Sequence, residues 1–131
     1  MDNWTGGAHW LPDSGGFFFS ALTADAKEFD QDVYLHRLLP APVTQQQPIA
    51  WTRDRSYRMV TVARNGRYAL AYERLDNPIP VAVADLRDSA WQWRPFITSY
   101  DGIVAGPVVG DRLIAVTDHS ADRGRLVGID L

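Results

Sequence analysis

The chain has 131 residues, enough for one domain with a modest core, and 46% of them are hydrophobic, which argues against a disordered chain. Its net charge is −3 and its Lys and Arg residues are scattered, so it lacks the clustered positive charge that nucleic acid binding requires. The absence of cysteine excludes disulfides, thiolate metal sites and a cysteine nucleophile, and no apolar run approaches the roughly 18–20 residues of a membrane span.

The N-terminal segment predicts a turn followed by a strand. The first ten residues, MDNWTGGAHW, lack a basic start followed by an apolar core, so we expect no secretory signal and a cytoplasmic location. The stretch from Trp10 to Gly16 combines Pro, Asp and Gly and is typical of a strand end followed by a turn. From Phe17 to Leu22 we expect a strand, because three consecutive aromatic residues favour β structure.

The segment from Gln31 to Leu38 fits two interpretations. Thr23 is a possible cap for a helix that reaches Leu39, with Phe29 and Val33 spaced for one helical face. The sequence Val-Tyr-Leu that begins at Val33 is instead β-prone, and a repeat described below also requires a strand here. We therefore expect a strand.

The next segment connects the first repeat to the second. From Leu39 to Pro48 the chain is rich in Pro and Gln and predicts a connector without a domain boundary. We expect the outer strand of the first repeat from Ile49 to Trp51, and a solvated charged loop from Thr52 to Arg58. A strand from Met59 to Ala63 then leads into a hairpin turn at Asn65-Gly66.

The second repeat continues with a strand from Arg67 to Tyr72, a charged loop that contains Pro78, and a strand that ends at Leu86. The segment from Trp91 to Ile97 alternates aromatic and polar residues, which predicts an outer strand with one wet face. We expect three further strands in the third repeat, from Ile103 to Val109, from Arg112 to Asp118 and from Arg125 to Leu131.

Three copies of one unit are visible in this order of elements. Turn glycines at Gly16, Gly66 and Gly110 precede closing leucines by 22, 20 and 21 residues. Those leucines, Leu38, Leu86 and Leu131, lie 48 and 45 residues apart. A period near that length, built from strands and turns, is typical of the blades of a β-propeller.

The strand sequences also indicate stacked sheets. YALAY, VAVA, LIAV and LVGI are apolar at every position, and a strand that is buried on both faces needs sheets above and below it. We therefore predict an all-β chain: a single partial β-propeller of about three four-stranded antiparallel blades at about 1–51, 52–98 and 99–131, the last incomplete. Because closed propellers use 4–8 blades, two faces stay uncovered, and we expect self-association or marginal stability.

Three stretches carry a resemblance to a known family. They are HWLPDSGGFFFSAL followed by QDVYLHRL, then VARNGRYALAYER, then GDRLIAVTDHSADRGRLVGIDL. Together they resemble the N-terminal β-propeller domain of prolyl oligopeptidases. In that family a seven-bladed propeller caps an α/β-hydrolase domain and admits short proline-containing peptides to a serine active site. The Gly-x-Ser-x-Gly turn of such a domain does not occur in this chain.

The resemblance also implies candidate site residues. In the family, a loop of the second blade helps line the substrate chamber, and the corresponding residues here are Glu73, Arg74, Leu75, Asp76 and Asn77. Some relatives carry a glycine and a cysteine where this chain has Arg74 and Leu75. We expect no catalytic residue, metal or cofactor site in this chain.

Other polar groups have both chemical and structural interpretations. The stretch from Asp118 to Asp122 places His119 between two carboxylates, which suits a divalent cation. No second cluster supplies further ligands, and a loop between strands explains the polarity without a metal, so we expect a loop. His36 and His9 are expected to be structural partners. The turn Arg123-Gly124-Arg125 could grip an anion, although we expect its arginines to pair with Asp122 and Asp130.

The tryptophans also admit two roles, a platform for a carbohydrate or a peptide, or packing between blades, and we expect packing. The five are Trp4, Trp10, Trp51, Trp91 and Trp93.

Our first hypothesis for function is a non-catalytic propeller fragment that gates peptide access to an α/β-hydrolase site outside this chain, with the catalytic domain of the parent as its partner. The alternative is a stand-alone, self-associating module with a peptide- or protein-binding face. A third is a small β-enzyme built around His119. We expect no partner among nucleic acids or membranes.

Overall fold

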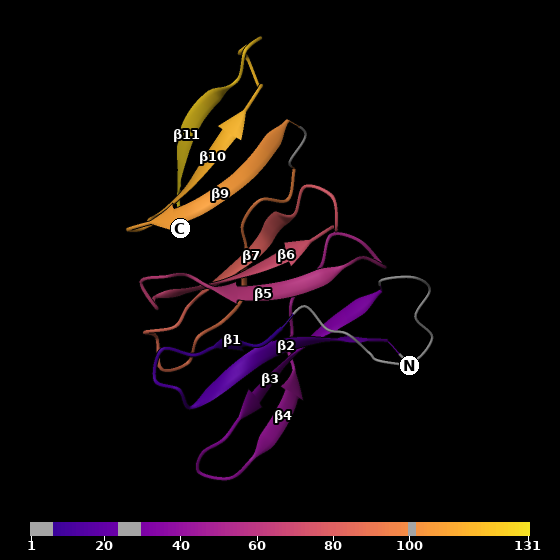
Figure 1. Ribbon diagram of the computed structural model, residues 1–131, viewed down its shortest axis with the longest axis vertical. Coiled ribbons are helices and arrows are strands. Elements are labelled where there is room, and N and C mark those ends of the chain that lie inside the picture. Colours follow the sequence, from indigo (N-terminus) through magenta and orange to yellow (C-terminus); the bar gives the residue numbers. More distant parts are fainter. Residues whose placement is uncertain (1–6, 24–29, 100–101) are drawn as a thin grey trace.

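The structure is a computed structural model, and it describes residues 7–23, 30–99 and 102–131 (Figure 1). The described residues form three antiparallel sheets and no helix, so they hold none that is long and apolar enough to cross a membrane. The first sheet contains β1 (His9–Trp10), β2 (Gly16–Leu22), β3 (Gln31–Arg37) and β4 (Val43–Gln46). The second contains β5 (Arg58–Val62), β6 (Tyr68–Glu73), β7 (Ile79–Asp85) and β8 (Arg94–Pro95). The third contains β9 (Ile103–Val109), β10 (Arg112–Thr117) and β11 (Arg125–Asp130).

The three sheets are stacked, with the second sheet between the other two (Figure 1). Within each sheet, consecutive strands are hydrogen-bonded neighbours, as in a meander. Four-stranded meanders stacked face to face are the geometry of propeller blades, and the stack does not close into a ring. The prediction of an all-β, partial β-propeller is therefore confirmed.

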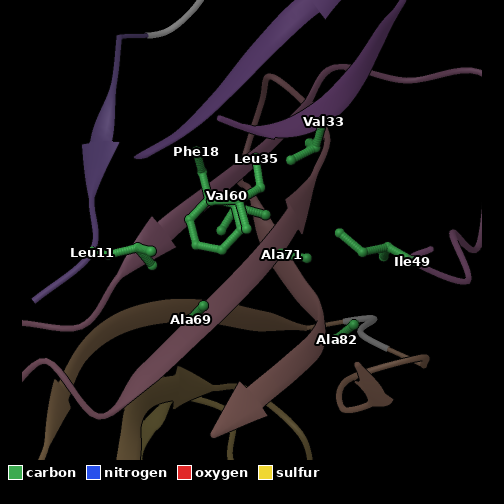
Figure 2. Packing of buried hydrophobic residues seen from close by; sticks show 9 residues of the cluster. All are labelled: Leu11, Phe18, Val33, Leu35, Ile49, Val60, Ala69, Ala71 and Ala82. Carbon is green, nitrogen blue, oxygen red and sulfur yellow. The ribbon is translucent and has the colours of Figure 1, made fainter. Parts of the chain in front are cut away.

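Large side chains of the first sheet pack against small side chains of the second. Phe18, Val33 and Leu35 are at most 3% exposed and meet Ala69 and Ala71, which are fully buried (Figure 2). Alanine has no side chain beyond Cβ, so the two sheets can approach closely here. Burial of a phenylalanine or leucine in such a contact stabilises the fold by about 1.5–3 kcal/mol per side chain.

The opposite face of the second sheet packs against the third sheet through larger residues. Tyr68, Leu70 and Val83 contact a cluster that includes Leu113 and Ile97, and all five are buried. The second sheet is thus covered on both faces. This confirms the prediction from YALAY and VAVA, since β6 and β7 are buried at nearly every position.

The same prediction is wrong for the third sheet. Strands β10 and β11 alternate buried or half-buried residues with exposed ones, although LIAV and LVGI are apolar throughout. Val104, Val116 and Leu126 are 56%, 44% and 74% exposed, because no described residue packs on that face of the sheet. Val116 lies opposite both Val104 and Leu126 in the strand register, so the three form one exposed apolar row.

The outer strands differ from the expectation. The outer strand of the first sheet is β4, within the stretch expected to be a connector, whereas residues 49–51 form no strand. Ile49 is instead buried and packs in the core between the first two sheets. In the second sheet, β8 pairs through two residues, far fewer than the predicted strand over 91–97. The segment 31–37 is a strand, as expected, and not a helix.

The three repeat glycines do not share one role. Gly66 and Gly110 have φ of +72° and +59°, the left-handed conformation that glycine adopts most easily in a turn. Gly16 lies in β2 instead, and a Cβ at that position would be 2.5 Å from the carbonyl oxygen of His36. The neighbouring strand leaves no room for a Cβ at this position, and this close approach, not a turn, explains the glycine.

Candidate functional site

Glu73, the first of the five expected chamber residues, is an internal support. Its side chain is fully buried, and its carboxylate accepts hydrogen bonds from the backbone N–H of Thr52 at 2.6 Å and of Arg53 at 3.3 Å. The Thr52 hydroxyl also donates to it. A buried carboxylate needs such donors, so Glu73 holds the start of the 52–57 loop against the end of β6.

The other four expected residues form the loop between β6 and β7. The Arg74 N–H donates to the Tyr57 carbonyl at 2.9 Å and to the Ser56 hydroxyl at 3.0 Å, which anchors one side of the loop. Asn77 Nδ2 donates to the Ile103 carbonyl at 2.9 Å, which ties the other side to the third sheet.

Between these two anchors, Leu75 and Asp76 form the tip of the loop. Both side chains are exposed, Leu75 to 53%. Arg74 and Asn77 have φ of +80° and +51°, so the residue on each side of the tip has the left-handed backbone conformation typical of tight turns. Leu75 and Asp76 are therefore exposed at the tip, and Asn77 is exposed as well but has its side-chain amide bonded to the third sheet.

A polar network fixes the neighbouring loop at this end of the sheets. Arg58 donates to the Asp32 carboxylate at 3.2 Å and to the carbonyl of Arg53 at 2.6 Å, and its guanidinium lies 4.9 Å from the Trp51 ring centre. The side-chain atoms Gln31 Oε1 and Arg58 Nε are buried without a hydrogen-bond partner. Arg58 therefore links both sheets and the loop at this end of the stack.

The 118–122 loop has the geometry of a tight turn. The Ala121 N–H donates to the Asp118 carbonyl at 3.0 Å, and the His119 N–H donates to the Thr117 hydroxyl at 3.1 Å. Across residues 7–23, 30–99 and 102–131, no three His, Asp or Glu side chains gather as metal ligands would. The metal interpretation of this loop gains no support. Asp130 pairs with Arg112 at 2.8 Å, and not with the expected arginine of the 123–125 turn.

Of the two histidines in the first sheet, His36 has structural partners. His36 Nδ1 shares a hydrogen bond of 2.7 Å with the Thr44 hydroxyl, and its ring lies 5.4 Å from that of Phe17. His9 is half-buried, and this burial lowers the pKa of its imidazole.

The tryptophans at the boundary of the first two sheets are packing residues. Trp91 and Trp93 lie with ring centres 5.6 and 6.1 Å from that of Phe18, and Trp51 packs beside them. The packing interpretation holds for these three. Trp10 is 51% exposed and contacts Phe17, while Trp4 lies outside the described residues.

The sequence did not indicate a groove that lies between these tryptophans and the outer strand of the first sheet. Its volume is about 790 Å³. The residues that line it are Leu35, Arg37, Gln45, Gln46, Gln47, Pro48, Trp91, Gln92 and Trp93. Two sequence features belong to this groove, the glutamine run at 45–47 and the alternation Trp-Gln-Trp at 91–93. They did not indicate it because the sequence predicts a connector where β4 lies and the outer strand at 49–51.

The chain is similar in structure to prolyl oligopeptidases. One solved structure, from a study of two prolyl endopeptidases and the role of inter-domain dynamics in their catalysis and specificity, matches 97% of this chain with 20% identity and a TM-score of 0.63. Prolyl oligopeptidase B from Galerina marginata matches 94% of the chain with 18% identity and a TM-score of 0.59.

The chain spans about a fifth of the length of these two structures, 20% of the first and 18% of the second. No protein-family profile and no curated protein matches the sequence. At this level of identity the likeness shows a shared fold, that of part of a prolyl oligopeptidase.

Proposed function

We propose that this chain is a non-catalytic part of the β-propeller of a prolyl-oligopeptidase-like serine peptidase. In this proposal it walls the path along which short proline-containing peptides reach an α/β-hydrolase active site, which other residues of the same protein supply, in the cytoplasm. The partner of the chain is that catalytic domain.

The observation that carries the proposal is the stack of three blade-like sheets. The match to part of a prolyl endopeptidase covers 97% of the chain that forms this stack. Two features agree with it. The buried polar groups of the chain, such as Glu73 and Arg58, are used to hold loops in place and not to face a cavity. The exposed row of Val104, Val116 and Leu126 is suited to cover by a further blade.

Within this proposal, the loop tip of Leu75 and Asp76 faces the peptide path. The tip is exposed while both its sides are anchored, so it can restrict a passage without itself moving far. Restriction by a fixed loop selects peptides by size. It does not change the chemistry at the active site.

Size selection by this loop is the test of the proposal. In the peptidase that contains this segment, Leu75→Gly combined with Asp76→Gly should raise cleavage of a 30-residue proline-containing peptide several-fold relative to a five-residue one. Leu39→Gly, an exposed leucine in the 38–42 turn, is the matched control and should leave the ratio unchanged. An unchanged ratio in the loop variant would contradict the gating role. Peptidase activity in the isolated 131-residue chain would contradict the non-catalytic role.

A second candidate function is a self-associating module. The apolar row of the third sheet favours it, because exposed apolar rows of this kind mark contact surfaces. In the module the row is covered by a second copy of the chain, whereas in the peptidase a further blade of the same protein covers it.

A further inference from the structure

The groove beside the outer strand β4 has a rigid apolar floor. Leu35 is 3% exposed. The half-buried rings of Trp91 and Trp93 both pack against Phe18, which is fully buried. The side chain of Trp93 donates from Nε1 to Gln47 Oε1 at 3.2 Å, which joins the two walls of the groove at one end. The floor is therefore fixed before any ligand arrives.

The groove runs beside the end of β4 and the residues that follow it, where Gln45, Gln46, Gln47 and Pro48 line it. Arg37, at one end of the groove, is paired with Val43 at the start of β4, and Gln47 follows the last residue of that strand. The guanidinium of Arg37 lies 5.5 Å from the ring centre of Trp91, and Trp93 meets Gln47 at the other end. Residues 45–47 line the groove, and Val43 lies opposite Arg37, so an extended peptide of about five residues beside residues 43–47 would reach from Arg37 to Gln47, since each residue of a strand adds about 3.3 Å.

The backbone of β4 is free along this groove. The Gln47 N–H donates to the Val33 carbonyl at 2.9 Å, and Leu35 is paired with Gln45 two residues along. In an antiparallel pair the hydrogen-bonded residues alternate, so the N–H and C=O groups of Thr44 and Gln46 point away from β3. Strand β4 is the last strand of its sheet in the described part of the chain, and these groups have no strand beside them.

Arg37 places an unpaired positive charge at one end. Among the described residues it forms no ion pair, and its guanidinium lies against the face of Trp91. Asp13 lines a small neighbouring cavity together with Arg37, but its carboxylate accepts the N–H of Gly15 at 2.8 Å. A guanidinium that lies at the end of a groove is suited to a carboxylate.

We propose that this groove binds an extended peptide that carries a carboxylate, and that the peptide adds to the edge of β4 as a further strand. Its backbone bonds to Thr44 and Gln46, alternate side chains lie on the Trp91 and Trp93 rings, and the carboxylate meets Arg37. Strand addition to a free sheet edge is a known mode of peptide recognition, in which backbone bonds give affinity and the groove gives specificity. The site lies on the outer edge of the sheets and does not depend on the gating role proposed above.

The probe is an N-acetylated pentapeptide, Thr-Val-Thr-Val-Phe, with a free C-terminal carboxylate, titrated into the isotope-labelled 131-residue chain. We expect amide chemical-shift changes confined to residues 43–47 and 91–93 and saturable with peptide. The same peptide with a C-terminal amide should bind about tenfold more weakly, because the Arg37 contact is lost. In the bound strand, alternate peptide N–H groups face β4 and the others face solvent. N-methylation of the set that faces β4 should abolish binding, and N-methylation of the other set should leave it unchanged.

Two variants test the residues. Arg37→Gln should remove the difference between the acid and the amide peptide. Gln46→Pro removes an N–H that points away from β3, so it should leave the fold intact and abolish binding, while Gln46→Ala binds normally. Thermal unfolding checks that each variant is folded.

Three outcomes would overturn the proposal. The first is the absence of shifts with the probe, and the second is equal binding of all N-methylated peptides. The third is a response of the groove residues to maltohexaose without a response to the peptide, which would assign the tryptophans to a sugar. Shifts confined to the groove, lost in Gln46→Pro and kept in Gln46→Ala, would confirm it.

Discussion

At the residue scale, the side chain of Glu73 joins the second sheet to the 52–57 loop. It is fully buried and accepts three hydrogen bonds from Thr52 and Arg53. Glu73→Ala leaves two backbone N–H groups without their acceptor, so we expect a loss of about 2–4 kcal/mol in the free energy of unfolding. Chemical denaturation measures it, with exposed Asp76→Ala as the control, which should cost less than about 0.5 kcal/mol. Equal, small losses in both variants would show that the three bonds do not stabilise the protein.

A pH dependence follows from His9. Burial lowers the pKa of its imidazole in the folded chain below the value in the unfolded chain, so folding favours the neutral ring. The associated stability is fully present above the unfolded pKa of about 6.5 and is lost as the pH falls from there toward the folded pKa. We expect the wild-type chain to lose more stability between pH 7.5 and pH 5.0 than His9→Gln does. Urea unfolding at the two pH values checks this, and identical losses would mean that His9 titrates as it does in the unfolded chain.

Residue types alone predicted several of these roles but not their partners. The packing role of Trp91 and Trp93 follows from the size of the indole ring, and it could be predicted. That Glu73 is buried could not, because a charged residue at the end of a strand, next to a charged loop, is exposed by default. Its burial depends on Thr52, 21 residues away, and such a contact exists only once the sheets are stacked.

At the element scale, the inner strands could be predicted from the sequence and the outer ones could not. Strands β2, β3, β5, β6 and β7 carry dense apolar patterns that the stacked sheets bury. Strand β4 is exposed at every position, so its sequence Val-Thr-Gln-Gln carries no such pattern. Ile49 is apolar and so favours a strand in the sequence, but it lies in a segment that forms no strand, and its side chain packs in the core.

The groove was missed for the same reason as β4. Its walls come from that exposed strand and from the 91–93 segment, which are brought together by the packing of Trp91 and Trp93 on Phe18. The five residues of the 73–77 loop, by contrast, could be named as one loop, because the strands on both sides of it are clear in the sequence.

The second and third sheets are also joined by a polar contact between their hairpin turns. Arg67 bonds both Asp85 and Asp111, the Tyr68 hydroxyl donates to Asp111 at 3.1 Å, and Asn65 Nδ2 donates to the Gly110 carbonyl at 2.9 Å. These turns are largely exposed, so the contact is weak, as surface ion pairs are.

Removal of this contact should loosen the third sheet. In Asp111→Ala we expect backbone amides of β9, β10 and β11 to exchange with solvent about two- to fivefold faster, and those of β2 and β3 to be unchanged. Hydrogen exchange measures this. Asp130→Ala is the control, because Asp130 pairs with Arg112 inside the third sheet. Equal acceleration in both variants would mean that the contact between the turns does not hold the sheets together.

At the scale of the whole molecule, the apolar row of the third sheet predicts how the isolated chain behaves. Val104, Val116 and Leu126 lie side by side across three strands and are exposed. We expect the isolated chain to self-associate, and Leu126→Glu to shift it toward the monomer because a carboxylate opposes burial of the row. Light scattering measures the mass. Leu39→Glu, which adds the same charge in the 38–42 turn, should have no effect, and a wild-type chain that stays monomeric at every concentration contradicts the expectation.

Our central proposal is that this stack of blade-like sheets is part of a serine peptidase whose active site lies outside these 131 residues. The most direct measurement is to capture the protein from its source cells with an antibody against this chain, and to treat the captured material with a fluorophosphonate probe for active serines. We predict a labelled polypeptide that contains this sequence and cleaves short proline-containing peptides. Captured protein that carries the sequence, takes up no probe and cleaves no such peptide would contradict the claim.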